Sequence, residues 1–372
     1  MEQIETVIIG GGQAGLSTGY YLQQQRRDFV ILDAHERIGD AWRKRWDSLR
    51  LFTPARYSGL AGMPFPAPAF AYPTKDAMAD YLESYATRFR LPVKPSVRAD
   101  KLSKQGDRFV VTAGDLRFEA ENVVVATGGY PAPRIPAFAR ELDPAIRQLH
   151  SSEYRRPSQL QEGGVLVVGA GNSGAEIALE VSRTHRTWLS GRHPGNEPSR
   201  AGSKMDRLVT PVIWFVFSHM LTVNTPLGRR VATQVRSHGL PLARVRPADL
   251  LAAGVDRIQA RTVGARDGQP LLADGRVLDV TNVIWCTGFQ PTYGWIALPI
   301  FGDDREPIHE RGVVATQPGL YFVGLFFQSA ATSSLVGGVG RDAAYIAERI
   351  AARASAVAKL EGHGAYTTIE PT

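Results

Sequence analysis

The stretch VIIGGGQAG spans residues 7–15, and a similar stretch, LVVGAGNSG, spans residues 166–174. In each copy an apolar run leads into the pattern G-x-G-x-x-G, which begins at Gly10 and at Gly169. The first glycine of this pattern permits a tight turn, the second lets the backbone approach a pyrophosphate, and the third lets helix and strand pack closely. The pyrophosphate lies at the helix N-terminus, where free N–H groups and the helix dipole favour negative charge. The sequence therefore predicts two dinucleotide-binding units.

The two copies differ in charge at one equivalent position. Asp33 lies 23 residues beyond Gly10, and Arg192 lies 23 residues beyond Gly169. A carboxylate at this position accepts hydrogen bonds from ribose hydroxyls and repels a phosphate, whereas an arginine clamps a 2′-phosphate with two parallel hydrogen bonds. We therefore expect FAD in the first unit and NADPH in the second. A solvated surface arginine is the alternative interpretation of Arg192.

The glycine patterns and the charged positions define two predicted sets of contacts. For FAD the set is Gly10, Gly12, Gln13, Ala14, Gly15 and Asp33. For NADPH the set is Gly169, Gly171, Asn172, Ser173, Gly174, Ser190, Arg192 and His193.

A second repeated feature supports an internal duplication. The apolar runs NVVVATGG and NVIWCTGF both end in Thr-Gly, and Thr127-Gly128 of the first run is assigned to the FAD site. Thr127 follows Gly10 by 117 residues, and Thr287 follows Gly169 by 118 residues. Each half therefore begins with a glycine turn and ends with a Thr-Gly strand at nearly the same distance.

These patterns predict an α/β fold with two Rossmann-like domains, in which the NADPH domain is inserted into the FAD domain. We expect the first part of the FAD domain over residues 1–157, the NAD(P)H domain over 158–287, and the C-terminal part of the FAD domain over 288–372. Alternation and turn residues over 97–118 predict a small antiparallel sheet. The proline-rich and polar stretch over 129–164 reads as a linker.

Two further segments carry specific expectations. The apolar run over 208–223 is shorter than the ~20 residues of a membrane span, so we expect a buried or cleft-lining helix, with a surface-associated helix as the alternative. A long C-terminal helix is expected to begin near Ser333 and Ser334. Its N-terminus either faces the flavin, where its N–H groups would stabilise negative charge, or is an ordinary capped helix end.

Composition excludes several classes of protein. A hydrophobic content of 44% and a charged content of 21% are typical of a globular protein, and the net charge of +7 is dispersed, without a basic–aromatic motif for nucleic acid. The single cysteine, Cys286, excludes an intrachain disulfide and dithiol chemistry. The eight histidines show no metal-ligand spacing. We expect no signal peptide, no metal, a cytoplasmic location and, by default, a homodimer.

Seven segments spread over most of the chain resemble the small bacterial flavin-containing monooxygenases, which belong to the class B flavoprotein monooxygenases. They are GGGQAG, IGDAWRKRWDSLRLFTP (residues 38–54), ATGGYPAPRIP, LHSSEY (residues 149–154), VVGAGNSGAEIA, CTGFQPTY and GLYFVGLFFQSAATSSLVGGVGRDAAYIA. The resemblance implies FAD held by the first and last segments and reduction by NADPH. Oxygen transfer to a thioether, an amine or a ketone would then follow through a C4a-(hydro)peroxyflavin.

The sequence departs from this family at two places. His150 and Tyr154 match the fingerprint F-x-G-x-x-x-H-x-x-x-Y/W, but no Phe-x-Gly stands at the expected spacing. Phe52 stands where many relatives carry an asparagine that contacts the oxygenated flavin, so we assign Phe52 as the catalytic position facing the flavin. The same departure resembles the subgroup that accepts NADH as well as NADPH. Trp42 and Trp46 are assigned to FAD, and both, with Phe52, are alternatively core residues.

Three functions follow from the resemblance. The first is an NAD(P)H- and O2-dependent monooxygenase acting on a small molecule. The second is an NAD(P)H oxidase or a flavin-dependent NADP reductase without productive oxygen transfer, because loss of the asparagine uncouples the reaction. The third is a non-catalytic redox-sensing flavoprotein that binds both nucleotides.

Overall fold

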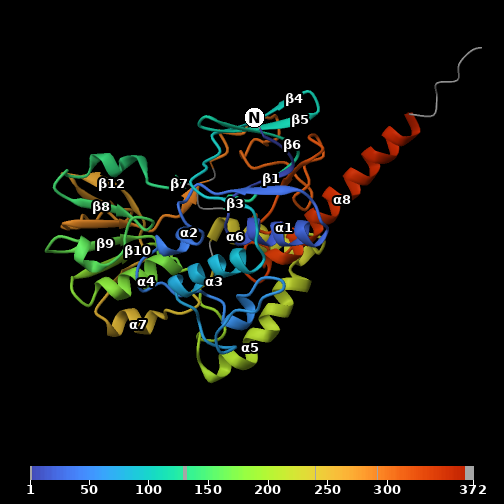
Figure 1. The fold of residues 1–372 in the computed structure, drawn as a ribbon. Helices are drawn as coiled ribbons and strands as arrows, with labels where there is room; N and C mark the ends of the chain where they lie inside the picture. The colour runs from blue at the N-terminus through green and yellow to red at the C-terminus, as the bar shows by residue number, and fades with distance from the viewer. Residues whose placement is uncertain (1, 129–131, 239, 291, 365–372) are drawn as a thin grey trace, which may run out of the picture.

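The computed structural model describes residues 2–128, 132–238, 240–290 and 292–364, and it contains two sheets that lie side by side (Figure 1). In spatial order the first sheet contains β3 (Val93–Lys94), β2 (Phe29–Leu32), β1 (Glu2–Ile9), β6 (Leu116–Val125), β5 (Arg108–Ala113) and β4 (Lys101–Gln105), and β16 (Leu320–Phe322) also pairs with β6. Strands β3, β2, β1, β6 and β16 are parallel, whereas β5 and β4 are antiparallel additions.

The long strand β6 joins two kinds of pairing in the first sheet. Near its start Phe118 pairs with Val111 of the antiparallel strand β5, and at its end Val125 pairs with Phe322 of the parallel strand β16. The antiparallel sheet predicted over 97–118 is thereby confirmed. Because β16 comes after the second unit in the chain, this pairing returns the C-terminal segment to the first sheet.

The second sheet is parallel throughout and lies at the left of Figure 1. Its order is β11 (Asp256–Ile258), β10 (Thr187–Ser190), β9 (Val165–Val168), β14 (Asn282–Trp285) and β8 (Arg147–His150). A separate antiparallel pair is formed by β12 (Thr262–Arg266) and β13 (Gln269–Leu272). Strand β8 lies within the stretch 129–164, so that stretch is more than a linker; its residues 129–131 lie outside the described part.

The two chain crossings between the units run side by side. The outgoing segment contains β7 (Ala132–Pro133), the returning segment contains β15 (Phe289–Gln290), and the two pair as antiparallel strands. A unit that leaves and rejoins its host at one place is an insertion. The predicted architecture of two Rossmann-like units, one inserted into the other, is confirmed.

Helices cover both sheets. On the first sheet lie α1 (Gln13–Gln24), α3 (Lys75–Arg88) and α8 (Val339–Gly364), and the second unit contains α4 (Asn172–Val181) and α7 (Pro247–Ala252). The remaining helices are α2 (Asp40–Arg43), α5 (Lys204–Phe215) and α6 (Pro226–His238), with a π-helical turn at Val216–Met220 and 3₁₀ turns at Ala55–Tyr57, Ala137–Glu141 and Pro157–Gln159. Helix α1 packs against α8, and both contribute buried side chains such as Leu16 and Ile346 to one core.

Two expectations about helices are wrong. Helix α8 begins at Val339 instead of near Ser333 and Ser334, because the preceding residues form turns, with Ser333 N bonded to Ala330 O. The run 208–223 is not a buried helix: Asp206 is the one buried residue of α5, and Leu208 is 73% exposed. One face of α5 packs on the protein, where Trp214 stacks on Tyr57, and the other face is exposed, so the surface-associated alternative stays a prediction.

A glutamate and an arginine lie close together inside the second unit. Glu176 of α4 has a side chain only 10% exposed, and its Oε1 lies 4.0 Å from Nε of Arg244. The oxygen has no hydrogen-bond partner, and neither has Nη1 of Arg244. Burial raises the pKa of Glu176 to about 7, against the attraction of Arg244. The folded chain therefore favours the neutral acid at this position.

We expect Glu176→Gln to change how stability depends on pH. Because the pKa of Glu176 in the folded chain lies above its ordinary value, its contribution to stability is fully present below about pH 4.5 and is lost as the pH rises to about 7. The glutamine does not titrate, so the free energy of unfolding of the variant should gain about 1–3 kcal/mol over wild type between about pH 5 and about pH 8. Urea unfolding at several pH values measures this gain. The exposed Glu162→Gln is the control, and a pH-independent difference for Glu176→Gln would contradict the analysis.

Candidate functional site: two anion-binding turns and the segments between them

The first glycine turn joins β1 to α1. Gly10 has φ +115°, and a Cβ there would lie 2.5 Å from the carbonyl oxygen of Ala126, at the end of β6. A Cβ on Gly15 would lie 1.8 Å from the carbonyl oxygen of Gly10. A Cβ on Gly12 would meet no atom within 4 Å. The first and third glycines are thus required by packing, whereas Gly12 faces open space at the start of the helix.

The second turn repeats this geometry between β9 and α4. Gly169 has φ +108°, and its Cβ would lie 2.3 Å from the carbonyl oxygen of Cys286. A Cβ on Gly174 would lie 1.8 Å from the carbonyl oxygen of Gly169, and one on Gly171 would meet nothing within 4 Å. The strand that approaches the turn is β14, which matches β6 in the first unit. The duplication inferred from the sequence is therefore also a duplication of backbone contacts.

The helices that follow the two turns have uncapped N-termini. Neither α1 nor α4 has a side-chain cap or an acidic residue in its first turn. By contrast, Thr74 caps α3 by accepting a hydrogen bond from Ala77 N, and Ser203 caps α5 by accepting one from Asp206 N. An uncapped N-terminus with open space at its glycine suits a pyrophosphate group. Both sites therefore fit a dinucleotide, with Gln13 and Ala14 at the first and Asn172 and Ser173 at the second.

Asp33 lies beside the first turn, directly after β2. It is 8% exposed; its Oδ2 accepts a hydrogen bond from Gly11 N at 2.6 Å and its Oδ1 accepts one from His35 N at 2.7 Å. These bonds hold the carboxylate at the end of the strand next to the turn. Thr127 and Gly128 follow β6 on the same edge of the sheet, and Thr127 is exposed. The structure thus brings the carboxylate, the glycine turn and Thr127 together at the carboxyl edge of the first sheet.

The corresponding position of the second unit has a different chemical character. Arg192 is exposed and follows Gly191, whose φ is +127°. Ser190 is buried, and its hydroxyl lies 2.8 Å from that of Thr262. The Nε2 of His193 lies 3.1 Å from Oδ1 of Asn196, whereas its Nδ1 is buried without a partner. Of Ser190, Arg192 and His193, only Arg192 is exposed, and its guanidinium is therefore a cation at the surface next to the turn.

The segment around α2 connects the two units. Trp46 is 4% exposed and packs in the core of the second unit with Leu49 and Tyr154, and its Nε1 has no hydrogen-bond partner. Trp42 is partly buried and packs against the cores of both units. The two tryptophans therefore lie at the junction between the units, and their assignment to FAD remains a prediction.

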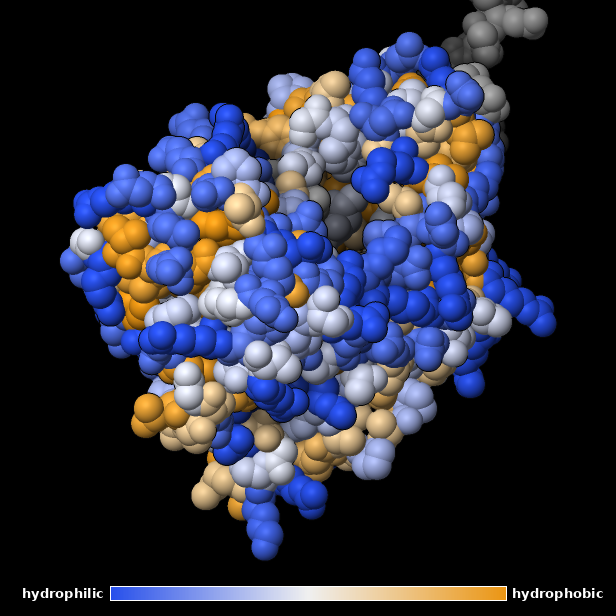
Figure 2. All heavy atoms as spheres, turned by 90° about the vertical axis from the view of Figure 1, so that its left-hand side faces the viewer, coloured by the Kyte–Doolittle hydropathy of each residue, from blue (hydrophilic) through white to orange (hydrophobic). Residues whose placement is uncertain are grey.

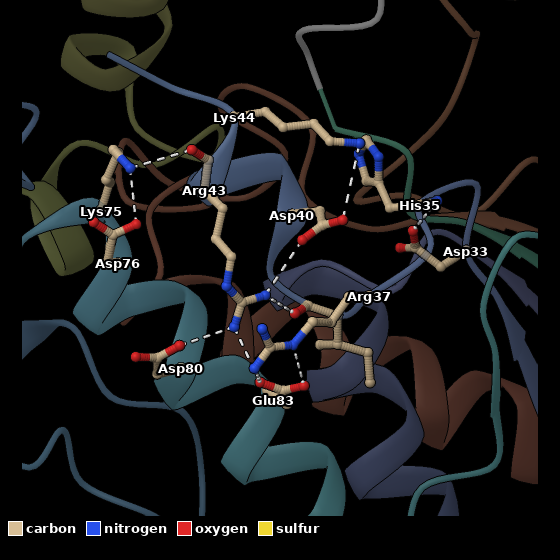
Figure 3. A network of polar contacts seen from close by, with 11 residues as sticks. Asp33, His35, Arg37, Asp40, Arg43, Lys44, Lys75, Asp76, Asp80 and Glu83 are labelled. Atoms are coloured by element: carbon tan, nitrogen blue, oxygen red, sulfur yellow. Dashed lines mark hydrogen bonds and ion pairs between the residues drawn. The ribbon is translucent and has the colours of Figure 1, made fainter. Parts of the chain in front are cut away.

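A network of charges fastens this segment to α3 (Figure 3). The guanidinium of Arg43 donates to the Ile38 carbonyl at 2.6 Å, to Asp80 at 2.9 Å and to Glu83 at 3.0 Å. Arg37 makes two hydrogen bonds to the same Glu83, at 2.7 and 2.6 Å. Figure 3 shows these side chains converging between α2 and α3. The segment that leads to Phe52 is thus held to the first unit by several bonds at once.

Phe52 itself is 39% exposed, whereas Leu51 and Pro54 on either side are buried. The next residue, Thr53, has its hydroxyl 2.9 Å from that of Ser58. The aromatic ring is therefore presented outward from a fixed backbone, as a substrate- or cofactor-facing side chain would be.

The fingerprint residues His150 and Tyr154 hold the connection between the units. Ser152 N donates to Nδ1 of His150, and Nε2 lies 3.0 Å from the carbonyl of Gly288, on the returning crossing. Burial lowers the pKa of His150, so the ring is neutral and Nε2 carries the proton. Tyr154 donates to Glu180 of α4 at 2.8 Å. Both residues are structural at the junction.

Ser333 and Ser334 lie in the turns before α8. The hydroxyl oxygen of Ser333 accepts hydrogen bonds from the backbone N–H groups of Ser329 and Ala330, both at 3.0 Å. Nearby, Asp342 of α8 is fully buried, and neither carboxylate oxygen has a hydrogen-bond partner. Burial raises its pKa. The sequence carried no signal for Asp342, because an aspartate in the first turn of a helix is ordinary.

A contact between the units was also missed by the sequence. Tyr72 of the first unit donates to Asp206 of α5 at 2.5 Å, and burial together with this bond raises the pKa of the tyrosine. Asp206 also accepts from Gly202 N at 2.8 Å. These residues are 134 positions apart, and neither belongs to a recognisable motif.

The described residues contain no group of three or more metal-ligating side chains. No helix in the part of the chain that the structure describes has the length and apolar character to cross a bilayer. Burial raises the pKa of the Cys286 thiol to about 12, so this thiol is protonated and unreactive at neutral pH.

Comparison with known proteins agrees with this geometry. The family described as pyridine nucleotide-disulphide oxidoreductase matches residues 7–229. The chain is 42% identical over 352 residues to an uncharacterized CzcO-like oxidoreductase of Geobacillus kaustophilus, covering 92% of this chain and 97% of that protein. A probable indole-3-pyruvate monooxygenase of Arabidopsis thaliana is 26% identical over 92% of this chain and 88% of its own length.

Among solved structures, a flavin-containing monooxygenase from Stenotrophomonas maltophilia is 30% identical and has a TM-score of 0.75, covering 95% of this chain and all of that one. A bacillithiol disulfide reductase from Staphylococcus aureus, at 15% identity and a TM-score of 0.69 over 95% of this chain and 99% of that one, shares the fold. The chain belongs to the pyridine nucleotide-disulphide oxidoreductase family and, within it, groups with the flavin-containing monooxygenases.

Proposed function

We propose that the protein is an NAD(P)H- and O2-dependent flavoprotein monooxygenase that transfers one oxygen atom to a small molecule with a soft nucleophilic centre, such as a thioether or an amine, or to a ketone. The observation that carries the proposal is the pair of uncapped glycine turns, one beside a carboxylate and one beside an arginine. The similarity to a bacterial flavin-containing monooxygenase over the whole chain supports the same function.

Each turn has a separate binding task. The N–H groups of α1 would hold the FAD pyrophosphate, and Asp33 would accept hydrogen bonds from the ribose. The N–H groups of α4 would hold the pyrophosphate of NADPH, with Arg192 on the 2′-phosphate and Ser190 and His193 beside it. We propose that NADH is accepted as well, as in the subgroup that the Phe52 departure resembles; His193 beside Arg192 is compatible with this. When bound, the flavin would supply the chemistry of hydride acceptance and dioxygen activation, which the side chains of this chain do not provide.

The protein must position these groups and exclude water. The charge network of Arg43 and the junction residue Trp46 fix the segment that presents Phe52. An apolar ring there excludes water and offers no hydrogen bond. This supports the second candidate, an NAD(P)H oxidase in which oxygen is released as hydrogen peroxide. A disulfide reductase is disfavoured, because the chain has one cysteine and its thiol is protonated.

The reaction of the reduced holoenzyme with oxygen tests the function. In a stopped-flow spectrometer with NADP⁺ present, we expect a transient near-ultraviolet absorbance before the oxidised-flavin bands return, and faster decay when a thioether is added. Direct return of the oxidised bands with stoichiometric hydrogen peroxide would instead establish the oxidase. In either case, Phe52→Asn should give a longer-lived near-ultraviolet transient than wild type. Absence of bound flavin after reconstitution would contradict both functions.

The two open glycines should separate the cofactor sites. Neither Gly12→Ala nor Gly171→Ala meets an atom within 4 Å, so both variants should fold. The added methyl group obstructs the close approach of a pyrophosphate. We expect Gly12→Ala to be purified with much less FAD than wild type, and Gly171→Ala to retain FAD but to show a KM for NADPH raised by at least about tenfold. Flavin absorbance and steady-state kinetics are the measurements, and equal effects of both variants on flavin content would contradict the assignment.

Arg192 should determine the preference between nicotinamide cofactors. A charge-assisted bond from arginine to phosphate contributes about 1.5–3 kcal/mol. Arg192→Ala should therefore raise the KM for NADPH by about 10- to 150-fold and leave that for NADH within about twofold. The nearby exposed Arg200→Ala is the matched control. An equal rise for both cofactors would show that Arg192 does not contact the 2′-phosphate.

A further inference from the structure

Helices α5 and α6 follow one another along the chain, with the π-helical turn and residues 221–225 between them. The name α5–α6 hairpin denotes only this stretch of the chain, residues 204–238. In Figure 1, α5 lies at the lower edge of the molecule. None of the exposed side chains that the structure describes there belongs to the two glycine turns or to the junction between the units.

One face of the hairpin is fixed to the body of the protein. Trp214 stacks on Tyr57 of the first unit, with ring centroids 4.7 Å apart. At the turn, the carbonyl of Ser218 accepts a hydrogen bond from Arg341 at 2.5 Å, and Val223 N donates to the carbonyl of Ser329 at 3.0 Å. These contacts, together with the bond from Tyr72 to Asp206, determine which face of α5 points outward.

The outward face of the hairpin is apolar. Leu208 is 73% exposed and Val212 is 61% exposed, in a part of the protein where α5 has a single buried residue. The large apolar side chains that are at least half exposed on the hairpin are Met205, Leu208, Val212, Phe215, Met220 and Leu227. The four on α5 follow spacings of three, four and three residues, which place them on one face of a helix. We call these four residues of α5 the apolar stripe.

Charge on the hairpin has one sign at the surface. Residues 207–240 contain no aspartate or glutamate. Lys204, Arg207, Arg229 and Arg230 are all exposed. The one acid of the hairpin, Asp206, is buried and accepts hydrogen bonds from Tyr72 and Gly202 N. In Figure 2 the lower end of the molecule likewise carries orange and tan atoms next to long blue side chains.

We propose that the apolar stripe docks on the surface of an anionic lipid bilayer, with α5 lying in the plane of the interface. A helix that presents leucine, phenylalanine and methionine on one face, flanked by basic residues, inserts that face between headgroups and acyl chains while the cations contact anionic lipid. A second copy of this chain fits the apolar stripe less well than a bilayer does. A two-fold interface would place the same patch against itself, and it would bring arginines against arginines with no acid between them.

Co-sedimentation of the full-length protein with vesicles tests the proposal. We expect the wild-type protein to sediment with vesicles of phosphatidylcholine containing about one third phosphatidylglycerol, and to bind pure phosphatidylcholine much more weakly. Leu208→Asp with Phe215→Asp should reduce binding to the anionic vesicles by at least about tenfold. Arg207→Gln with Arg230→Gln should reduce binding to the anionic vesicles by about fivefold for each arginine, and should change binding to pure phosphatidylcholine vesicles little.

The control is Leu251→Asp, which introduces one negative charge at a leucine that is 78% exposed on α7, and it is compared with the single variant Leu208→Asp as well as with the double variant. It should bind vesicles as wild type does. All variants should retain flavin and the wild-type circular dichroism spectrum, because the replaced side chains are exposed, so loss of binding is distinguishable from loss of folding. Equal sedimentation of wild type and Leu208→Asp/Phe215→Asp would overturn the proposal. A second pair of results would also overturn it. These are that wild type does not bind vesicles and that light scattering shows a wild-type dimer which the double variant does not form.

Discussion

The structure depends on the close approach of a strand carbonyl to a glycine that has no Cβ. In the first unit the carbonyl of Ala126 lies where a side chain of Gly10 would begin, and in the second the carbonyl of Cys286 occupies the same place at Gly169. This approach lets the central strand, the neighbouring strand and the helix meet at one point. The helix N-terminus then opens toward solvent at the carboxyl edge of the sheet, where its N–H groups have no internal partner.

The paired crossings, His150 and the segment around α2 join the first unit to the second. The paired crossings β7 and β15 bring the chain out and back at a single place, and His150 bonds across them to Gly288. The segment around α2 belongs to the first unit by its bonds to α3, yet it buries Trp46 in the second. The packing of Trp46 and the hydrogen bond of His150 therefore join the two units at their junction.

The α5–α6 hairpin belongs to the same arrangement but faces the other way. Its inner face contacts Tyr57 and the turns before α8, which carry Ser329 and Ser333. Its outer face leaves apolar side chains in water, which costs free energy unless another surface covers them. The hairpin therefore connects the turns before α8 with the exposed apolar stripe.

The sequence by itself determined the fold class, the duplication and the sign of the charged residue after each glycine turn, Asp33 in the first unit and Arg192 in the second. Glycine spacing, the strands before it and the charge 23 residues later are local patterns, and local sterics make them specific. Tertiary structure decided what depends on side chains distant in the chain. Asp342 became a buried unpartnered acid, Tyr72 met Asp206, and Trp46 entered the core of the neighbouring unit only through packing. The run 208–223 has the same hydrophobicity whether it is buried or exposed. The tertiary contacts of Trp214, Ser218 and Val223, with the bond from Tyr72 to Asp206, decide which face points to solvent.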